Sequence, residues 1–206
     1  RARWIRAVRG GSGPAEGGDA EARVAIHEHG AGFTVDVRHG QKTGFFLDQR
    51  ANRARVAALA AGARVLNLCS YTGGFSVACG RAGAAAVTSV DLAPAAIAAA
   101  DAHWTDNQLA PGAHHGVVAD CFGFLTEAAT ARRTWDLVIA DPPSFAASEA
   151  ARPRALEAYQ RLNRDALAVT RRGGLLVSAS CSSHVDVADL RGVVAAAGAD
   201  LRRRLR

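Results

Sequence analysis

The chain has 206 residues, of which 49% are hydrophobic and 21% are charged, a composition typical of one compact α/β domain rather than of a disordered or fibrous chain. It contains no run of about 20 apolar residues and no apolar leader at its start, so we expect no membrane span and a cytoplasmic location. The net charge of +6 and the pI of about 9.9 favour an anionic partner such as a nucleic acid, although an Ala- and Arg-rich composition alone gives the same bias.

The first 62 residues precede the main repeating pattern. Residues 9–20 are Gly-rich and poor in apolar side chains, which indicates that residues 1–21 form a flexible N-terminal segment or linker. Two short runs, residues 24–29 and 32–37, carry β-branched residues and indicate a β-hairpin. Asp48 stands at an N-cap position before a helix expected over residues 49–61. We therefore divide the chain into a linker, a hairpin with a lead-in helix over residues 22–62, and a core over residues 63–206.

From residue 64 onward, strand patterns alternate with helix patterns. Strands are predicted over residues 64–70, 85–91, 115–120, 135–141 and 175–180. Helices are predicted over residues 75–83, 95–107, 121–133 and 150–171 and from about residue 185, with a turn at Gly173-Gly174. Five strands joined by helices require right-handed crossovers, so the fold class is α/β with a doubly wound, Rossmann-like parallel sheet. The fifth strand should leave an open sheet edge.

Ligands of such sheets bind beyond the carboxyl ends of the strands. Segment 67–74 ends the first strand with two glycines, which let a ligand approach the backbone closely. Asp91 ends the second strand, at about the spacing at which an acidic residue meets a ribose. Asp120-Cys121 ends the third strand and would meet an adenine ring, while Asp120 also suits a helix N-cap. NAD fits poorly because the G-x-G-x-x-G fingerprint is absent, whereas S-adenosylmethionine (SAM) has no phosphates that need it.

The segments KTGFFLDQR, LNLCSYTGGFS, SVDLA, DPPSF and SASCS occur in this order between about residues 22 and 190. In this combination the chain resembles the RlmI-type class I SAM-dependent methyltransferases, which methylate large-subunit ribosomal RNA at carbon 5 of cytosine. The resemblance implies SAM as cofactor, ribosomal RNA as partner and a role in rRNA processing. The residues it implies for cofactor binding are Gln49, Asn67, Tyr71, Thr72, Gly73, Gly74, Asp91, Asp120, Cys121 and Asp141. Family members usually carry an RNA-binding PUA domain and two further C-terminal strands, neither of which is expected in these 206 residues.

Two strand ends carry the expected chemistry. In the loop 141–145, Asp141 would meet the Watson–Crick edge of a flipped base, with Pro142 and Pro143 stiffening the loop and Phe145 stacking on the ring. Phe145 as a core residue is the alternative. Cys181 would add to carbon 6 of cytosine and so activate carbon 5 for methylation, the alternative being a small buried residue. Asp141 and Cys181 are the predicted catalytic residues.

The other cysteines, Cys69, Cys79 and Cys121, are interpreted as core or loop residues. The chain has no CxxC pair, so neither a zinc site nor a disulfide framework is predicted, and no metal is expected. Exposed arginines would contribute to RNA affinity: Arg38, Arg50, Arg152, Arg154 and Arg161.

Three other functions remain open: a purine N-methyltransferase that uses the 141–145 loop without a thiol, a non-catalytic SAM- or RNA-binding module, and a dehydrogenase. A homodimer is also open.

Overall fold

The computed structural model describes residues 22–40 and 44–205. The helices and strands in chain order are β1 (Arg23–Glu28), β2 (Ala31–Asp36), the 3₁₀ helix η2 (Leu47–Gln49), α1 (Arg50–Ala57), β3 (Arg64–Leu68), α2 (Gly74–Arg81), β4 (Ala86–Asp91), α3 (Pro94–Asp106), β5 (His114–Val118), α4 (Cys121–Thr130), β6 (Trp135–Ala140), the 3₁₀ helix η3 (Glu149–Ala151), α5 (Arg152–Val169), β7 (Thr170–Ser178) and α6 (Val187–Asp200). The proposed linker 1–21 and the first two residues of the KTGFFLDQR motif, 42 and 43, lie outside the described residues.

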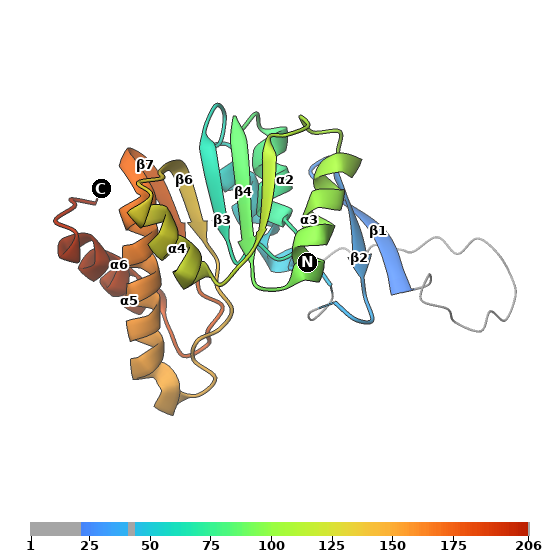
Figure 1. Ribbon diagram of the computed structural model, residues 1–206. Helices are drawn as coiled ribbons and strands as arrows, with labels where there is room; N and C mark the ends of the chain where they lie inside the picture. Colours follow the sequence, from blue (N-terminus) through green and yellow to red (C-terminus); the bar gives the residue numbers. More distant parts are fainter. Residues whose placement is uncertain (1–21, 41–43, 206) are drawn as a thin grey trace, which may run out of the picture.

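Five parallel strands form the main sheet in the order β5-β4-β3-β6-β7, and β1 and β2 form a separate antiparallel hairpin (Figure 1). This confirms the predicted doubly wound sheet and the hairpin before it. The chain runs outward from β3 through β4 to β5 and then returns to β6, on the other side of β3. The switch in strand order therefore lies between β3 and β6, where open α/β sheets bind their ligands.

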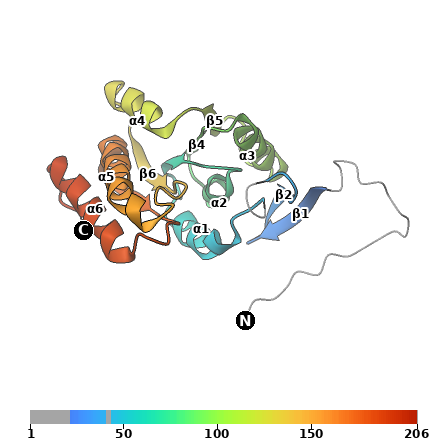
Figure 2. The ribbon, with the colours of Figure 1, turned by 90° about the horizontal axis from the view of Figure 1, so that it is seen from below.

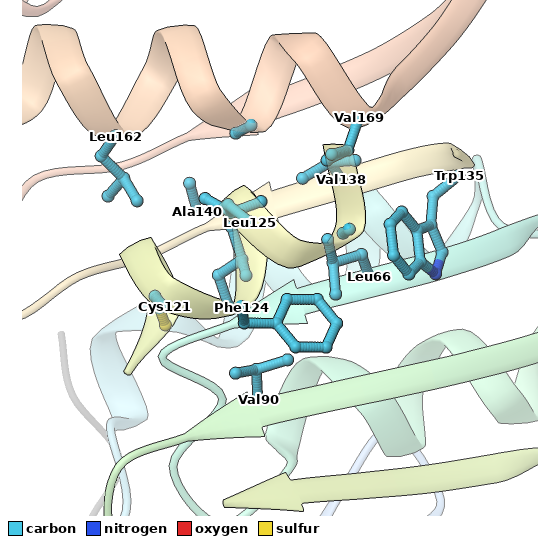
Figure 3. Close-up of a cluster of buried hydrophobic side chains, with 13 residues drawn as sticks. Leu66, Val90, Cys121, Phe124, Leu125, Trp135, Val138, Ala140, Leu162 and Val169 are labelled. Carbon is cyan, nitrogen blue, oxygen red and sulfur yellow. The ribbon is translucent and has the colours of Figure 1, made fainter. Parts of the chain in front are cut away.

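Alternating side chains of the central strands fill two cores, one on each face of the sheet. Leu66 and Val138 belong to a cluster that packs against α4 and α5 (Figure 3). Their neighbours Val65 and Ile139 point the other way, into a cluster with α1, α2 and α3. Figure 2 shows these two groups of helices on opposite sides of the sheet. Strands that are apolar on both faces are the expected pattern for a parallel sheet covered by helices.

The hairpin is fastened to the core by polar contacts with α3. Its two-residue turn, His29 (φ +48°) and Gly30 (φ +79°), has the left-handed backbone that suits the twist of a tight hairpin. The side-chain amide of Asn107 accepts from Gly32 N at 2.9 Å and donates to Gly32 O at 2.7 Å, like an added peptide unit. Phe33 and other hairpin residues bury their side chains against α2. The hairpin therefore forms part of the structure that supports the strand tips.

Two local predictions were wrong. Asp48 is not the N-cap of α1: it lies in η2, and Gln49 occupies the cap position without a side-chain cap bond. The predicted turn at Gly173-Gly174 lies inside β7, opposite a register irregularity between Trp135 and Leu137 of β6. Glycine is needed there because a Cβ on Gly174 would lie 2.7 Å from the carbonyl oxygen of Asp136. The two glycines thus accommodate a bulge within β7 instead of forming a turn before the strand.

β7 lies at the edge of the sheet, as expected, with β6 as its neighbour among the described strands. Leu175 on this strand is 43% exposed.

Candidate cofactor and active site

The loops that follow β3, β4, β5, β6 and β7 leave the same edge of the sheet, because all five strands run parallel. Backbone pairing continues past the ends of several strands, with Ser70 N donating to Val90 O at 3.0 Å and Ala179 N donating to Ala140 O at 2.9 Å. The first residues of these loops are therefore held in register with each other. The candidate site is this edge of the sheet.

The loop after β3 makes a sharp turn into α2. Gly73 is the residue before the helix and has φ +79°, and a Cβ there would lie 2.8 Å from the Cβ of Ala100 on α3. Cys69 (φ +53°) and Tyr71 (φ +47°) also take the left-handed conformation, which is uncommon for residues other than glycine. The loop is thus folded tightly between β3 and α3.

Asp91 joins this loop to the end of β4. One carboxylate oxygen accepts from Tyr71 N at 2.8 Å, and the other accepts from Ala93 N at 3.0 Å. The side chain is half-buried, so each oxygen keeps a lone pair that a ribose hydroxyl could use.

The end of β5 carries Asp120 and Cys121. Asp120 caps α4 by accepting from Gly123 N at 2.9 Å, which confirms the N-cap interpretation, and its side chain is otherwise exposed. The thiol of Cys121 points inward, with its Sγ 3.4 Å from the Sγ of Cys69. The ends of β3 and β5 thus meet across the end of β4.

Asp141 is the most strongly perturbed carboxyl at this edge. Its Oδ1 accepts a long hydrogen bond of 3.4 Å from Gln49 Nε2, so the lead-in segment lies over the tip of β6. Burial raises the pKa of Asp141 to about 6, the nearby charge of Asp48 adds to the rise, and Arg53 opposes it. A carboxyl with this pKa exists in both protonation states near neutral pH, which is typical of functional sites.

The loops after β6 and β7 are joined by a cluster of hydroxyl groups centred on Ser182. Its Oγ lies 2.7 Å from Ser144 Oγ and 3.1 Å from the hydroxyl of Tyr159, and it accepts from Ala146 N at 3.3 Å. Ser180 Oγ donates to the Tyr159 hydroxyl at 2.9 Å. These bonds hold the two predicted catalytic loops against each other.

Cys181 lies between Ser180 and Ser182 in the sequence and is exposed. Its Sγ lies 3.9 Å from the carbonyl oxygen of Pro142, the residue after Asp141. The structure therefore brings the loops of the two predicted catalytic residues together. Pro143 is exposed beside them.

Two expected contacts differ from the geometry. Asn67 is 1% exposed and donates to Ser76 Oγ at 2.9 Å under α2, so its side chain stabilises the packing of β3 against this helix instead of facing the strand tips. Phe145 is half-buried, with its ring centroid 4.8 Å from that of Tyr159, and it packs against two core clusters. The core interpretation of Phe145 thus describes its position better than base stacking does.

Sequence reasoning missed several residues that position the site. His103 Nδ1 donates to Thr72 O at 2.8 Å and its Nε2 accepts from Thr34 N at 3.1 Å, so it ties the glycine loop to the hairpin. Arg53 forms a buried ion pair with Glu28 that joins α1 to the hairpin, and its charge acts on Asp141. Each of these bonds joins residues at least 25 positions apart, and no local pattern signals such pairs.

The residues at this edge fit SAM. Three carboxylates, Asp91, Asp120 and Asp141, stand at the ends of β4, β5 and β6. Such a set repels a pyrophosphate and suits a cofactor that carries a sulfonium and an ammonium group. When SAM binds, Asp91 would hold its ribose and Asp120 would lie near its adenine. Among the described residues, no helix is long and apolar enough to cross a membrane, and no group of three acidic, His or Cys side chains could hold a metal ion.

The strand order, the glycine turn after β3 and the acidic residue ending β4 together define a Rossmann-like protein that binds an adenosine-containing cofactor. The sequence profile of the S-adenosylmethionine-dependent methyltransferases matches residues 14–189. The chain belongs to this family.

Relatives of known name are longer than this chain. A ribosomal RNA large subunit methyltransferase of Deinococcus radiodurans is 44% identical over 183 residues, which are 89% of this chain and 45% of the relative. The ribosomal RNA large subunit methyltransferase I of Shewanella frigidimarina is 36% identical over 182 residues, 88% of this chain and 46% of the relative. The chain thus spans about half the length of the relatives it matches.

Two solved structures are similar over nearly the whole chain. A crystal structure in complex with SAH, the demethylated product of SAM, is 34% identical, has a TM-score of 0.76 and covers 91% of this chain and 47% of its own. A structure from Streptococcus mutans is also 34% identical, with a TM-score of 0.78 and coverage of 93% and 48%. Both show the same fold, and the first binds the product of the cofactor for which the residues here are suited.

Proposed function

We propose that this chain is the catalytic part of a cytoplasmic methyltransferase that transfers the SAM methyl group to carbon 5 of a cytosine in large-subunit ribosomal RNA. The observation that carries the proposal is the meeting of the Asp141 and Cys181 loops, with Cys181 Sγ 3.9 Å from Pro142 O, at the edge where the glycine turn and Asp91 lie. The named relatives act on ribosomal RNA, which supports this substrate class. The surplus of arginines supports an anionic partner.

Carbon 5 of cytosine is a weak nucleophile because its electrons are shared with the ring. The thiolate of Cys181 adds to carbon 6, a sulfur–carbon bond forms, and the electron pair of the 5,6 double bond moves onto carbon 5. The protonated fraction of the Asp141 carboxyl can donate to ring nitrogen 3, which draws electrons from carbon 6 and favours this addition. The exposure of Cys181 gives a flipped base access to the sulfur.

When bound, SAM would supply an electrophilic methyl group to carbon 5, which the addition of Cys181 has made nucleophilic. A base then removes the carbon 5 proton. The electron pair of that C–H bond restores the 5,6 double bond, and the bond between carbon 6 and sulfur breaks, so that Cys181 leaves as the thiolate. The hydroxyl cluster around Ser182 keeps the loop that carries Cys181 against the loop that carries Asp141 during both steps. Gln49 orients the Asp141 carboxylate from the opposite side.

The test incubates the chain with labelled SAM and unmethylated ribosomal RNA and identifies the product nucleoside by mass spectrometry. We expect 5-methylcytidine, which Cys181→Ala abolishes and the exposed neighbour Ser183→Ala preserves. RNA that contains 5-fluorocytosine should form a covalent adduct with Cys181, because fluorine cannot leave as the proton does. A methylated purine nitrogen that survives Cys181→Ala would establish the N-methyltransferase alternative. Binding of SAM and RNA without methyl transfer would reduce the chain to a binding module.

A further inference from the structure

Two thiols that take no part in the proposed bond-making steps face each other at the strand tips. Cys69 Sγ and Cys121 Sγ are 3.4 Å apart although 52 positions separate them in the sequence. Cys69 follows β3 and Cys121 begins α4 after β5, so the pair spans the end of the intervening strand β4. Cys121 is 8% exposed, and Cys69 is half-buried.

The two sulfurs are chemically unequal. Cys121 is the first residue of α4, where the free backbone N–H groups of a helix favour a negative charge. A hydrogen bond from the Cys69 thiol lowers the pKa of Cys121, and the same bond raises the pKa of Cys69. The pair therefore consists of a Cys69 thiol that donates and a Cys121 sulfur whose thiolate form this hydrogen bond stabilises. Cys79, in contrast, lies in a different core cluster at 0% exposure.

We propose that Cys69 and Cys121 are a peroxide-responsive pair that forms a disulfide next to the cofactor site. The Cys121 thiolate attacks one oxygen of the peroxide, the O–O bond breaks, and the departing oxygen takes a proton, which leaves a sulfenic acid. The Cys69 sulfur then attacks the Cys121 sulfur, the S–O bond breaks, and the hydroxide leaves with the thiol proton as water. Two thiols lose two electrons and the peroxide gains them.

Closing the bond changes the place where the proposed SAM contacts meet. The two sulfurs must move from 3.4 Å to about 2.05 Å, so the loop after β3 and the start of α4 approach each other. Tyr71 N, two residues from Cys69, is bound to Asp91, and Asp120 directly precedes Cys121. We expect the disulfide to weaken SAM binding by about tenfold or more, since displacements near 1 Å at such sites have effects of this size or larger. This effect on SAM rests on the proposed function, whereas the disulfide itself does not.

The experiment uses the Cys181→Ser chain, because the exposed thiol of Cys181 would otherwise react with peroxide first. Hydrogen peroxide is added, the remaining thiols are alkylated, and tryptic peptides are mapped by mass spectrometry before and after dithiothreitol. Cleavage at Arg64, Arg81 and Arg132 places Cys69 and Cys121 in different peptides, although Cys69 shares its peptide with Cys79. A Cys79→Ser variant therefore serves as the matched control, and it should still form the crosslink. Calorimetry with SAM is run on both redox forms.

We expect a reducible crosslink between Cys69 and Cys121, a trappable sulfenic acid on Cys121 in Cys69→Ser, and a weaker SAM affinity that dithiothreitol restores. Alkylation of both thiols after a peroxide dose that oxidises Cys181 in the unmodified chain would overturn the proposal. A crosslink that leaves the SAM affinity unchanged would also overturn the proposal, because oxidation of the pair would then have no effect on cofactor binding. If neither form binds SAM, the proposed function fails, while the peptide map still decides whether the pair is redox-active.

Discussion

A buried ion pair between the hairpin and α1 gives the sharpest test of how the site is supported. Arg53 Nε lies 2.6 Å from Glu28 Oε1, and its Nη2 lies 2.7 Å from Glu28 Oε2, so the ion pair is bidentate. Arg53 is only 3% exposed and Glu28 only 7% exposed. The same Nη2 donates to Phe46 O at 3.0 Å, and the guanidinium lies 4.5 Å from the ring centre of Phe45. Within this set of contacts, each buried charge is therefore compensated by the other.

Removing one partner of such a pair leaves a buried, uncompensated charge, so we expect Arg53→Met to lower the free energy of unfolding by about 3–5 kcal/mol. Glu28→Gln should cost nearly as much, because the guanidinium is then unpaired. The double variant should lose much less than the sum, giving a coupling energy on the order of 3 kcal/mol. The measurement is urea unfolding followed by circular dichroism. Arg55→Met, an exposed arginine on the same helix, is the control and should change stability by less than about 0.5 kcal/mol.

Additive effects of the two single substitutions would refute this reasoning. They would mean that the two charges are solvated independently and that the hairpin does not depend on the pair for its attachment to α1. Because Arg53 also opposes the rise in the pKa of Asp141, its loss should move the titration of that carboxyl to still higher pH.

Two further predictions concern the catalytic loops. Burial and the charge of Asp48 raise the pKa of Asp141 from 3.8 to about 6, so the folded chain holds a proton that the unfolded chain has released, and stability falls as pH rises from about 4 to 6. Asp141→Asn should remove this pH dependence and, at pH 8, raise the free energy of unfolding by about 2 kcal/mol while abolishing methyl transfer. Urea titrations of both chains at pH 4 and pH 8 measure the difference. A variant that is no more stable than the unmodified chain at pH 8 would contradict the prediction. Tyr159→Phe removes the hydroxyl bonded to Ser180 and Ser182, which should cost about 1–2 kcal/mol and lower kcat about 100-fold with SAM affinity unchanged. Leu162→Val on the same helix should cost about as much stability without this loss of kcat, and equal losses in both variants would point to a general effect of destabilisation.

The fold was predictable because its signals are local. Strands that bury both faces read as short, mostly apolar runs, as in residues 64–68 and 135–140, and each is followed by a helix pattern. The wrong predictions came from glycines and caps, whose meaning depends on neighbours. Gly174 is required by the carbonyl of Asp136, 38 positions earlier, so its sequence context suggested a turn where the strand in fact continues.

The candidate site was predictable only as far as topology reaches. Parallel strands must end at one edge, so the order of strand and helix patterns alone places Asp91, Asp120 and Asp141 together. Which way each side chain points was less accessible: Asn67 stands at the end of the same strand as the glycine turn, yet the alternation of the strand directs its amide under α2. Contacts such as the one between Cys69 and Cys121 arise from the crossing of loops, for which periodicity gives no information.

The position of Cys181 depends on the pairing of β6 with β7, which begins at the opposite end of the sheet. The bulge at Gly173-Gly174 shifts the register so that Ser178 lies opposite Ala140, and the next residue, Ala179, still donates to Ala140 O. Because side chains alternate along a strand, a slip of one residue would exchange every inward and outward position of β7. Ser182 would then lose Ser144 and Tyr159, and the sulfur would leave the neighbourhood of Pro142. A backbone irregularity at the far end of β7 therefore sets whether the thiol of Cys181 lies beside the loop that follows β6.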